Sequence, residues 1–359
     1  MLPTASVHRD SPSSFPRASV KHLSESASLT SVPSNYAAFQ PCDPIASEPH
    51  NIPTIDFSTL VTGTPDQRSQ IVRDLGLACK EWGFFMLINH GVDERLRQRM
   101  IDVCGGFFDL SEAEKRGYVG SSALDPVRYG TSFNPTVDQV MYWRDFLKVF
   151  LHPAFHAPDK PADFRESSLE YCTKVRGVAR EVLRGICESL GLEGCYMEKE
   201  LQLEESGIQL LVTNLYPPCP QPGLAMGMPP HTDHGLITIL TQNDIGGLHV
   251  QHQGKWFLVD PLPNSFVVNI GDHLEIFSNG IYKSGLHRAV VNNNRTRISV
   301  AIALGPPLDA KVTPAQQLLE KENCLPKYRG VTYREYLHFQ QNKPLQGNSC
   351  LDLVRTSVN

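Results

Sequence analysis

The sequence predicts a mainly β protein with flanking helices, in which a double-stranded β-helix, or jelly roll, follows an N-terminal α/β region. From about residue 206 onward, short runs rich in β-branched and aromatic residues alternate with turn residues, a pattern typical of a sandwich or barrel. Before that point, longer segments carry apolar residues at helical spacing, which predicts amphipathic helices. Hydrophobic residues make up 41% of the chain and charged residues 20%, so a sizeable core can be buried.

The N-terminal half is expected to combine helices with two strands. The expected elements are a short helix within 18–30, an edge strand at 52–57, helices at 67–82 and 93–110, and a buried strand at 84–88. Gly83 is expected to end the first long helix. Ser111 and Glu114 have the spacing of a capping box, which predicts that another helix begins there.

A long helix over 163–190 carries a single apolar stripe and is expected to stop at Gly191. The β-rich part that follows contains seven expected strands, at 208–216, 236–241, 248–251, 256–261, 266–270, 287–291 and 298–304. Residues 313–337 are expected to be helical again and to pack against the core as a lid or buttress.

These elements suggest a division of the chain into five parts. They are a disordered extension (1–17), an N-terminal helical and α/β region (18–165), a long connecting helix (166–205), the jelly-roll catalytic core (206–310), and a C-terminal helical segment and tail (311–359).

Charge and composition narrow the class of partner. The net charge of -5 argues against nucleic acid, and no apolar run approaches the roughly 18 residues that span a bilayer. The N-terminus lacks the apolar core of a secretory signal, and the nine cysteines form no C-x-x-C pairs. We therefore expect a cytoplasmic monomer (a nuclear location is also compatible) with reduced thiols, whose partner is a small molecule rather than nucleic acid or membrane.

One group of residues predicts a metal site. His231 and Asp233 are two residues apart, so in an extended chain their side chains point the same way, and His287 can join them from another strand. Two imidazoles and one carboxylate can hold one face of a ferrous ion and leave three positions open. The alternative is that these are surface polar residues, because a lone His-x-Asp is common.

Arg297 and Ser299 strengthen the functional interpretation. They also lie two residues apart on an expected strand, and arginine offers a planar fork that matches a carboxylate. An exposed charged strand is the alternative. The apolar run at 300–303 favours a buried strand, where a lone arginine is costly without an anionic partner.

Several motifs together resemble the plant soluble 2-oxoglutarate/Fe(II)-dependent dioxygenases. They are Asn214-Leu215-Tyr216-Pro217-Pro218-Cys219-Pro220, His231-Thr232-Asp233, Asn269-Ile270-Gly271-Asp272, His287-Arg288-Ala289-Val290, Arg297-x-Ser299, Trp82-Gly83-Phe84-Phe85, Ile88-Asn89-His90-Gly91 and Trp143-Arg144-Asp145. The resemblance covers residues from about 18 to 340. Within the superfamily, residues 131–134 ahead of Trp143 look most like the group that contains the downy-mildew-resistance salicylate hydroxylases.

The resemblance implies roles for individual residues. His231, Asp233 and His287 would bind Fe(II), and 2-oxoglutarate, the co-substrate, would contact Arg297, Ser299, Tyr216 and Asn214. Substrate would contact Phe133, Tyr129 and Ala303. Ala303 departs from the family, in which this position often carries a phenylalanine. Molecular oxygen is the second co-substrate, and ascorbate is expected as an auxiliary reductant.

The implied function is oxidation, and most simply hydroxylation, of a small plant metabolite of the phenolic, flavonoid or coumarin type. A hormone oxidase of the gibberellin or salicylate type is the first alternative, and a 2-oxoglutarate-independent oxidase of the same fold is another. A non-catalytic receptor on this scaffold and a metal-binding structural β-sandwich are further alternatives. Desaturation and demethylation remain open beside hydroxylation.

Overall fold

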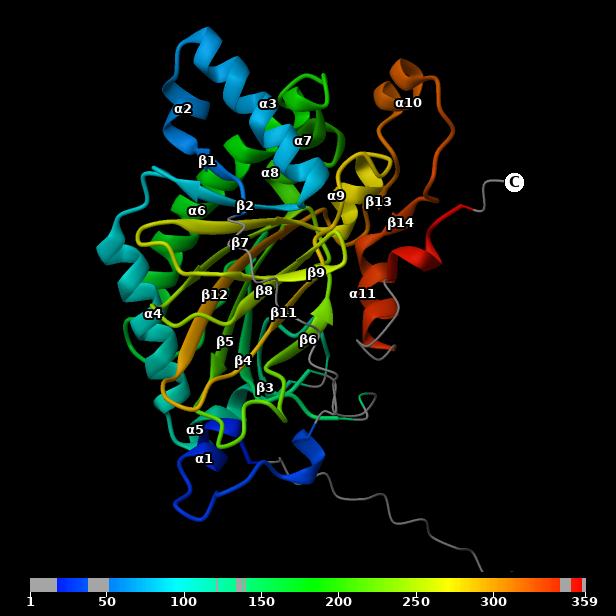
Figure 1. Cartoon of the computed structure of the whole chain (residues 1–359). Helices are drawn as coiled ribbons and strands as arrows, with labels where there is room; N and C mark the ends of the chain where they lie inside the picture. Colours follow the sequence, from blue (N-terminus) through cyan, green and yellow to red (C-terminus); the bar gives the residue numbers. More distant parts are fainter. Residues whose placement is uncertain are drawn as a thin grey trace, which may run out of the picture.

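The structure is a computed structural model that describes residues 18–37, 52–120, 122–133, 138, 140–342 and 350–356. The extension expected at 1–17 lies outside the described residues. Two β-sheets form the centre of the molecule, and helices pack against one of them (Figure 1). This arrangement confirms a mainly β fold with flanking helices.

The larger sheet has eight strands. In spatial order they are β1 (Thr54–Asp56), β2 (Phe84–Ile88), β10 (Phe266–Ile270), β7 (Ile237–Gln242), β12 (Arg297–Gly305), β5 (Ile208–Tyr216), β4 (Asp145–His152) and β3 (Val127–Thr131). The smaller sheet has the order β6 (Met228–His231), β11 (His287–Ala289), β8 (Leu248–His252) and β9 (Lys255–Val259). Only the β1–β2 pair is parallel in these two sheets.

The large sheet has two different faces because side chains alternate along a strand. On β5 and β12, one set of alternate residues, which includes Leu211 and Val300, enters the main hydrophobic core beside the helices. The helices that supply this core are α2 (Phe57–Thr62), α3 (Pro65–Glu81), α4 (Glu94–Asp109) and α6 (Phe164–Ser189). The other set, which includes Asn214 and Ser299, faces the second sheet and borders a cavity between the sheets.

Local sequence signals fix where the N-terminal helices begin and end. α3 starts at a capping box between Thr64 and Gln67, and the capping box predicted at Ser111 precedes α5 (Glu112–Lys115). Gly83 follows α3 with φ +68°, and a Cβ there would lie 2.4 Å from the carbonyl oxygen of Lys283. Only glycine fits this turn from helix into strand.

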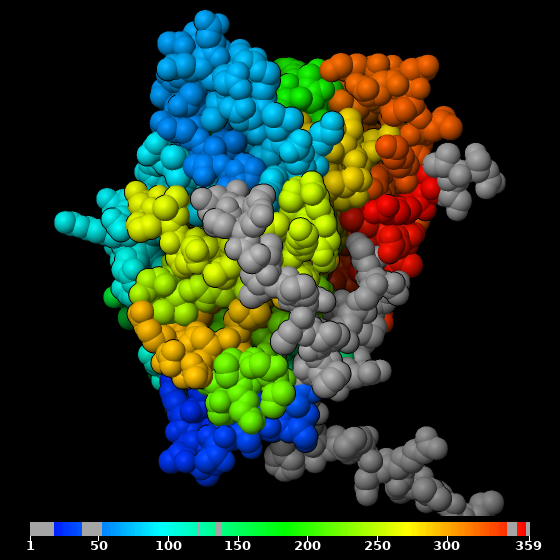
Figure 2. Space-filling model, in the orientation of Figure 1, coloured from blue at the N-terminus to red at the C-terminus, as the bar shows by residue number. Residues whose placement is uncertain are grey.

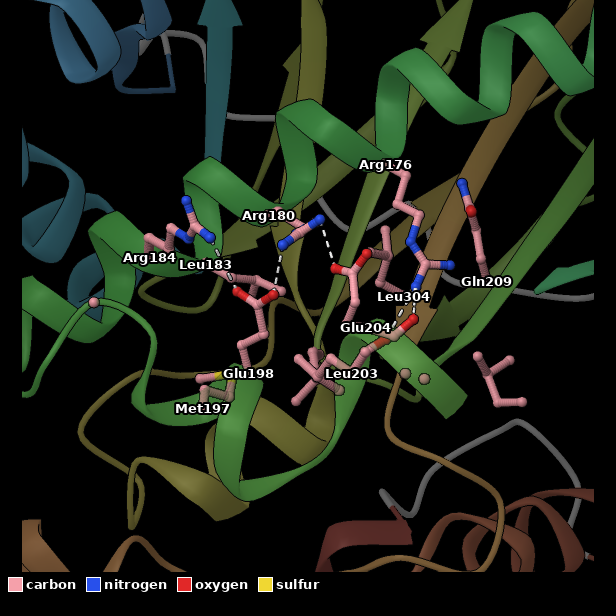
Figure 3. A pocket seen from close by; sticks show the side chains of 15 residues that line it. Arg176, Arg180, Leu183, Arg184, Met197, Glu198, Leu203, Glu204, Gln209 and Leu304 are labelled. Carbon is pink, nitrogen blue, oxygen red and sulfur yellow. Dashed lines mark hydrogen bonds and ion pairs between the residues drawn. The ribbon is translucent and has the colours of Figure 1, made fainter. Parts of the chain in front are cut away.

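The segment after α6 differs from the single connecting helix expected to residue 205. α6 ends at Ser189, as Gly191 (φ +72°) predicted, and two short helices, α7 (Tyr196–Glu200) and α8 (Leu203–Ser206), follow. Arginines on α6 hold them, as Figure 3 shows: Arg180 forms ion pairs with Glu198 (2.6 Å) and Glu204 (2.5 Å).

The remaining elements lie at the ends of the chain and around the sheets. They are α1 (Val20–Ser24), η1 (Ser34–Tyr36), η2 (Arg116–Tyr118), α9 (Asp272–Phe277), the strand pair β13 (Lys311–Val312) and β14 (Val331–Thr332), α10 (Gln316–Glu322), α11 (Tyr333–Gln341) and η3 (Cys350–Leu353). The helix expected over 313–337 is thus two helices, with β14 between them. The segment 18–37 lies at the opposite end of the molecule from α3 (Figure 2).

In the described part of the chain, no helix combines the length and apolar character needed to cross a membrane. The cysteines within the same residues are all free thiols.

Candidate active site

A cavity of about 790 Å³ lies between the two sheets. Strands of both sheets line it, and the C-terminal end of α11 borders it near Leu337. Every residue to which the sequence assigns a site role borders this one cavity: Asn214, Tyr216, His231, Asp233, His287, Arg297, Ser299, Tyr129, Phe133 and Ala303.

Three potential metal ligands converge on one side of the cavity. His231 at the end of β6 is directly paired with His287 at the start of β11, so their imidazole rings lie 4.2 Å apart. Asp233 follows β6, and its Oδ1 is 3.7 Å from the Nε2 of each histidine. One ligand atom from each residue lies within 4.8 Å of the other two, a spacing that suits a single shared ion.

The outward-facing atoms of the same three residues are occupied. His231 Nδ1 is 2.8 Å from the carbonyl oxygen of Pro229, and His287 Nδ1 is 3.0 Å from that of Gly285. Asn269 donates from Nδ2 to Asp233 Oδ2 at 2.9 Å. Because a carbonyl oxygen can only accept a hydrogen bond, Nδ1 is the nitrogen that carries the hydrogen in each ring. In the neutral imidazole, Nε2 then presents its lone pair, as a metal ligand requires.

The protonation states of His231 and Asp233 also favour the binding of a cation. Burial, assisted by the neighbouring His287, lowers the pKa of His231 to about 3, so its imidazole is neutral at physiological pH. Burial alone would raise the pKa of Asp233, but His287, His231 and the hydrogen bond from Asn269 hold it at about 2. The carboxylate is therefore ionised and the imidazole is unprotonated.

Asp272 supports the loop that carries the ligands. Its backbone N–H donates to the carbonyl oxygen of Asp233 at 2.8 Å, and its carboxylate accepts from Thr232 Oγ1 at 3.2 Å and from Tyr336 on α11 at 2.5 Å. Burial raises the pKa of Asp272 to about 7. The sequence placed Asn269 and Asp272 in a motif of the resemblance but gave neither a role.

Arg297 forms a second polar centre in the cavity. Its side chain is 2% exposed and lies over the ring of Tyr216, 5.1 Å from the ring centroid. One nitrogen donates to Gln242 at 2.6 Å, whereas Nε has no hydrogen-bond partner. Among the described residues, no carboxylate lies within ion-pair distance of this guanidinium. A buried cation without a protein anion fits the carboxylate of a ligand.

Strand pairing gathers the other predicted co-substrate residues around Arg297. Arg297 faces Tyr216 across β12 and β5, and Ser299 faces Asn214. The amide of Asn214 donates to Ser299 Oγ at 3.4 Å. Arg144 is a further buried cation here, which the sequence identified only as part of a motif. It donates to Asn214 Oδ1 at 3.0 Å.

The three predicted substrate residues are placed differently from one another. Ala303 borders the cavity from β12, and Phe133 borders it beyond the end of β3. Tyr129 also borders the cavity, but its ring packs against Phe107 and Phe108 of α4, on the helical side of the sheet. This packing does not favour a substrate contact for the Tyr129 ring.

Comparison with known proteins agrees with this site. Residues 207–306 match the 2OG-Fe(II) oxygenase superfamily, and residues 52–169 match the N-terminal region described as non-haem dioxygenase in morphine synthesis. The chain is 45% identical to 2-oxoglutarate-dependent dioxygenase 19 of Oryza sativa subsp. japonica, over 87% of this chain and 93% of that protein. The chain therefore belongs to the 2OG-Fe(II) oxygenase superfamily and is an Fe(II)/2-oxoglutarate-dependent dioxygenase.

Within the superfamily, the chain is similar to plant enzymes of the downy-mildew-resistance type, which confirms the resemblance. It is 37% identical to DOWNY MILDEW RESISTANCE 6 of Arabidopsis thaliana (90% of this chain, 95% of that protein) and 39% identical to flavanone 3-dioxygenase 2 of Oryza sativa subsp. japonica (85% and 88%). The solved structure of JOX2 in complex with 2OG, Fe and JA superimposes with a TM-score of 0.85 at 31% identity, covering 96% of this chain and 99% of that one. The predicted jelly-roll fold is confirmed.

Proposed function

We propose that His231, Asp233 and His287 bind Fe(II), and that Arg297 and Ser299 bind the distal carboxylate of 2-oxoglutarate. The observation that carries this proposal is the convergence of two histidine nitrogens and one carboxylate oxygen in the cavity that also contains Arg297, a buried cation with no carboxylate partner among the described residues. Tyr216 and Asn214 complete the co-substrate contacts, because β5 places them directly opposite Arg297 and Ser299.

The chain's own residues supply position, charge and exclusion of water. When bound, ferrous iron, 2-oxoglutarate and dioxygen together supply the oxidation of a substrate C–H bond, with succinate and carbon dioxide as the other products. The Arg297 guanidinium, buried between β12 and β5, would orient the co-substrate through a charge-assisted contact that is stronger there than in water. The similarity to 2-oxoglutarate-dependent dioxygenase 19 disfavours an oxidase of the same fold that does not use 2-oxoglutarate.

We propose a small plant metabolite as the substrate, hydroxylated near Phe133 and Ala303. A phenolic, flavonoid or coumarin is favoured because the cavity is large, about 790 Å³, and its walls include apolar and aromatic side chains such as Phe84 and Phe146. The similarity to flavanone 3-dioxygenase 2 supports this class. A hormone of the gibberellin or salicylate type is the alternative.

The other expectations remain proposals as well. We propose that the chain acts as a cytoplasmic monomer without nucleic-acid partners, that ascorbate serves as an auxiliary reductant, and that residues 206–310 form the catalytic core.

The decisive test uses Asp233→Ala and Arg297→Gln beside the wild type. Fe(II) binding is measured anaerobically, and succinate release is measured in air with 2-oxoglutarate and a panel of plant metabolites. We expect Asp233→Ala to lose iron and turnover, and Arg297→Gln to keep iron but to require at least tenfold more 2-oxoglutarate. Full activity of Asp233→Ala after metal stripping and restoration of Fe(II) would contradict the metal assignment.

A further inference from the structure

Two cations border the cavity away from the residues assigned to iron and 2-oxoglutarate. Arg128 on β3 and Lys148 on β4 lie directly opposite each other at the edge of the large sheet (Figure 1). Both are half-buried and both line the cavity. Like charges placed opposite each other across a strand pair normally destabilise a sheet, so their position here requires an explanation.

The two side chains lie on the cavity face of the sheet. Lys148 pairs with Val212 on β5, which in turn pairs with Ala301 on β12, and all three border the cavity. Arg128 lies over the ring of Phe146 (5.5 Å) and Lys148 over that of Phe150 (5.3 Å). The two cations are thus held against aromatic walls and not extended into bulk water.

Neither cation has an anionic partner in the described part of the chain. Lys148 donates to the carbonyl oxygen of Ala123. Asp125 influences both cations through space but lies beyond ion-pair distance, and it accepts a hydrogen bond from the Ser122 backbone. Burial, with help from Arg128, lowers the pKa of Lys148 to about 7, as expected for a cation that lacks a partner.

The arginines on the outer face of α6 provide a contrast. There, Arg180 and Arg184 each contact glutamates, so their charges are neutralised within the protein (Figure 3). The charges of these two arginines are therefore compensated by neighbouring side chains. The pair on β3 and β4 lacks this compensation at the cavity, where a ligand could supply it.

We propose that, among the small plant metabolites of the proposed function, the substrate is an organic acid, such as a phenolic acid, whose carboxylate binds between Arg128 and Lys148. The rest of the molecule would extend over Val212 and Ala301, whose small side chains leave room, toward Asp233 and the two histidines. Two strand spacings, about 10 Å, separate Lys148 from Ala301, so the carbon that is oxidised lies well away from the carboxylate. This inference rests on the proposed function, because it concerns the substrate of the same cavity.

The test compares acids with their neutral methyl esters. The probes are cinnamate with methyl cinnamate and octanoate with methyl octanoate. Binding is measured calorimetrically without oxygen, in the presence of Fe(II) and saturating 2-oxoglutarate, so that the probes do not enter the co-substrate site. We expect at least one acid to bind about tenfold or more tightly than its ester.

Variants identify the contacts responsible. Arg128→Gln and Lys148→Gln should each weaken acid binding about tenfold or more and change ester binding less than twofold. Arg165→Gln is the matched control, because Arg165 also lies over a phenylalanine (Phe155, 5.2 Å) but is exposed on α6 outside the cavity lining. It should leave both affinities unchanged.

The outcomes separate this inference from the proposed function. Three results would overturn the inference. They are equal binding of acid and ester, no binding of either acid, and a preference for the acid that persists in both variants. Each of these results leaves the assignments of iron and 2-oxoglutarate standing. A wild-type chain that fails to bind Fe(II) contradicts the proposed function. The effect of the Arg128 and Lys148 variants on acid and ester binding then still decides the inference, because neither residue belongs to the proposed iron or 2-oxoglutarate site.

Discussion

Replacing Asn269 should weaken metal binding although this residue is not a proposed ligand. Its amide donates to Asp233 Oδ2 at 2.9 Å, which leaves Oδ1 as the oxygen that faces His231 and His287. Without this donor the carboxylate can rotate, and it loses a hydrogen bond to a charged group, worth about 1.5–3 kcal/mol. If that free energy appears in metal binding, the Kd rises about 10- to 100-fold, the range found for residues that orient metal ligands.

Two variants distinguish orientation from packing. Asn269→Ala removes the donor and some volume, whereas Asn269→Asp keeps the size and replaces the donor with a second carboxylate. The aspartate variant should therefore lose at least as much affinity as the alanine variant. Gln98→Ala is the control, because Gln98 also donates an amide hydrogen to a carboxylate (Asp102, 2.8 Å) but on the exposed surface of α4.

The assay is titration of the metal-free protein with Co(II), and anaerobically with Fe(II), combined with thermal unfolding to show that each variant is folded. We expect both Asn269 variants to unfold cooperatively and to bind metal more weakly, and Gln98→Ala to match the wild type. Metal affinities within twofold of the wild type in both folded Asn269 variants would refute the argument that this hydrogen bond orients Asp233.

Three further substitutions test other parts of the site. Arg297→Ala should raise the KM for 2-oxoglutarate at least tenfold with little change in Fe(II) affinity; an unchanged KM would exclude the role proposed for the guanidinium. Ala303→Phe should fill part of the cavity and cost about 1–3 kcal/mol of stability at most, so KM should rise for bulky substrates more than for small ones; equal changes for both would show that substrate does not reach β12 there. The pKa of Lys148 is about 7 in the folded protein and 10.5 ordinarily, so above pH 7 the unfolded chain holds more protons at this residue and wild-type stability gains as pH rises toward 10. Lys148→Met has no titrating group at this position, so it should have a higher Tm than the wild type near pH 7. This difference in Tm should become smaller by pH 9–10. A difference in Tm that does not depend on pH would contradict the burial of this charge.

The sequence predicted the central strands well because their information is local. β5 has the predicted bounds, and β12 contains the whole of its predicted strand. The strict alternation of side chains placed Arg297 and Ser299 on one face, which the structure confirms as the cavity face. Glycine and capping signals likewise marked where α3 and α6 end and where α5 begins.

Other strands were missed because only long-range pairing stabilises them. β6 contains Pro229 and Pro230, which disfavour a strand in the interior of a sheet but are tolerated in β6, an edge strand. β3 is short, and its neighbour β4 is defined by pairing with β5, about 60 residues away in sequence. Because β3 was not predicted, its alternation could not be applied, and the sequence did not show that the Tyr129 ring packs on the helical side of the sheet.

The two faces of the large sheet explain how one scaffold can combine fixed chemistry with a variable substrate. On β5 and β12, the residues that face α4 and α6 are packed on all sides, so a change there costs stability. The residues that face the cavity are polar at one end of β12, around Arg297, and small at the other, around Ala303. Because successive cavity-facing residues lie about 7 Å apart, co-substrate and substrate can occupy neighbouring positions of the same strand. β3 forms the edge of this sheet and β4 lies beside it, and Arg128 and Lys148 on these strands border the cavity next to Val212. In our proposal these two charges set the preference for substrate, whereas Arg297 contacts the co-substrate.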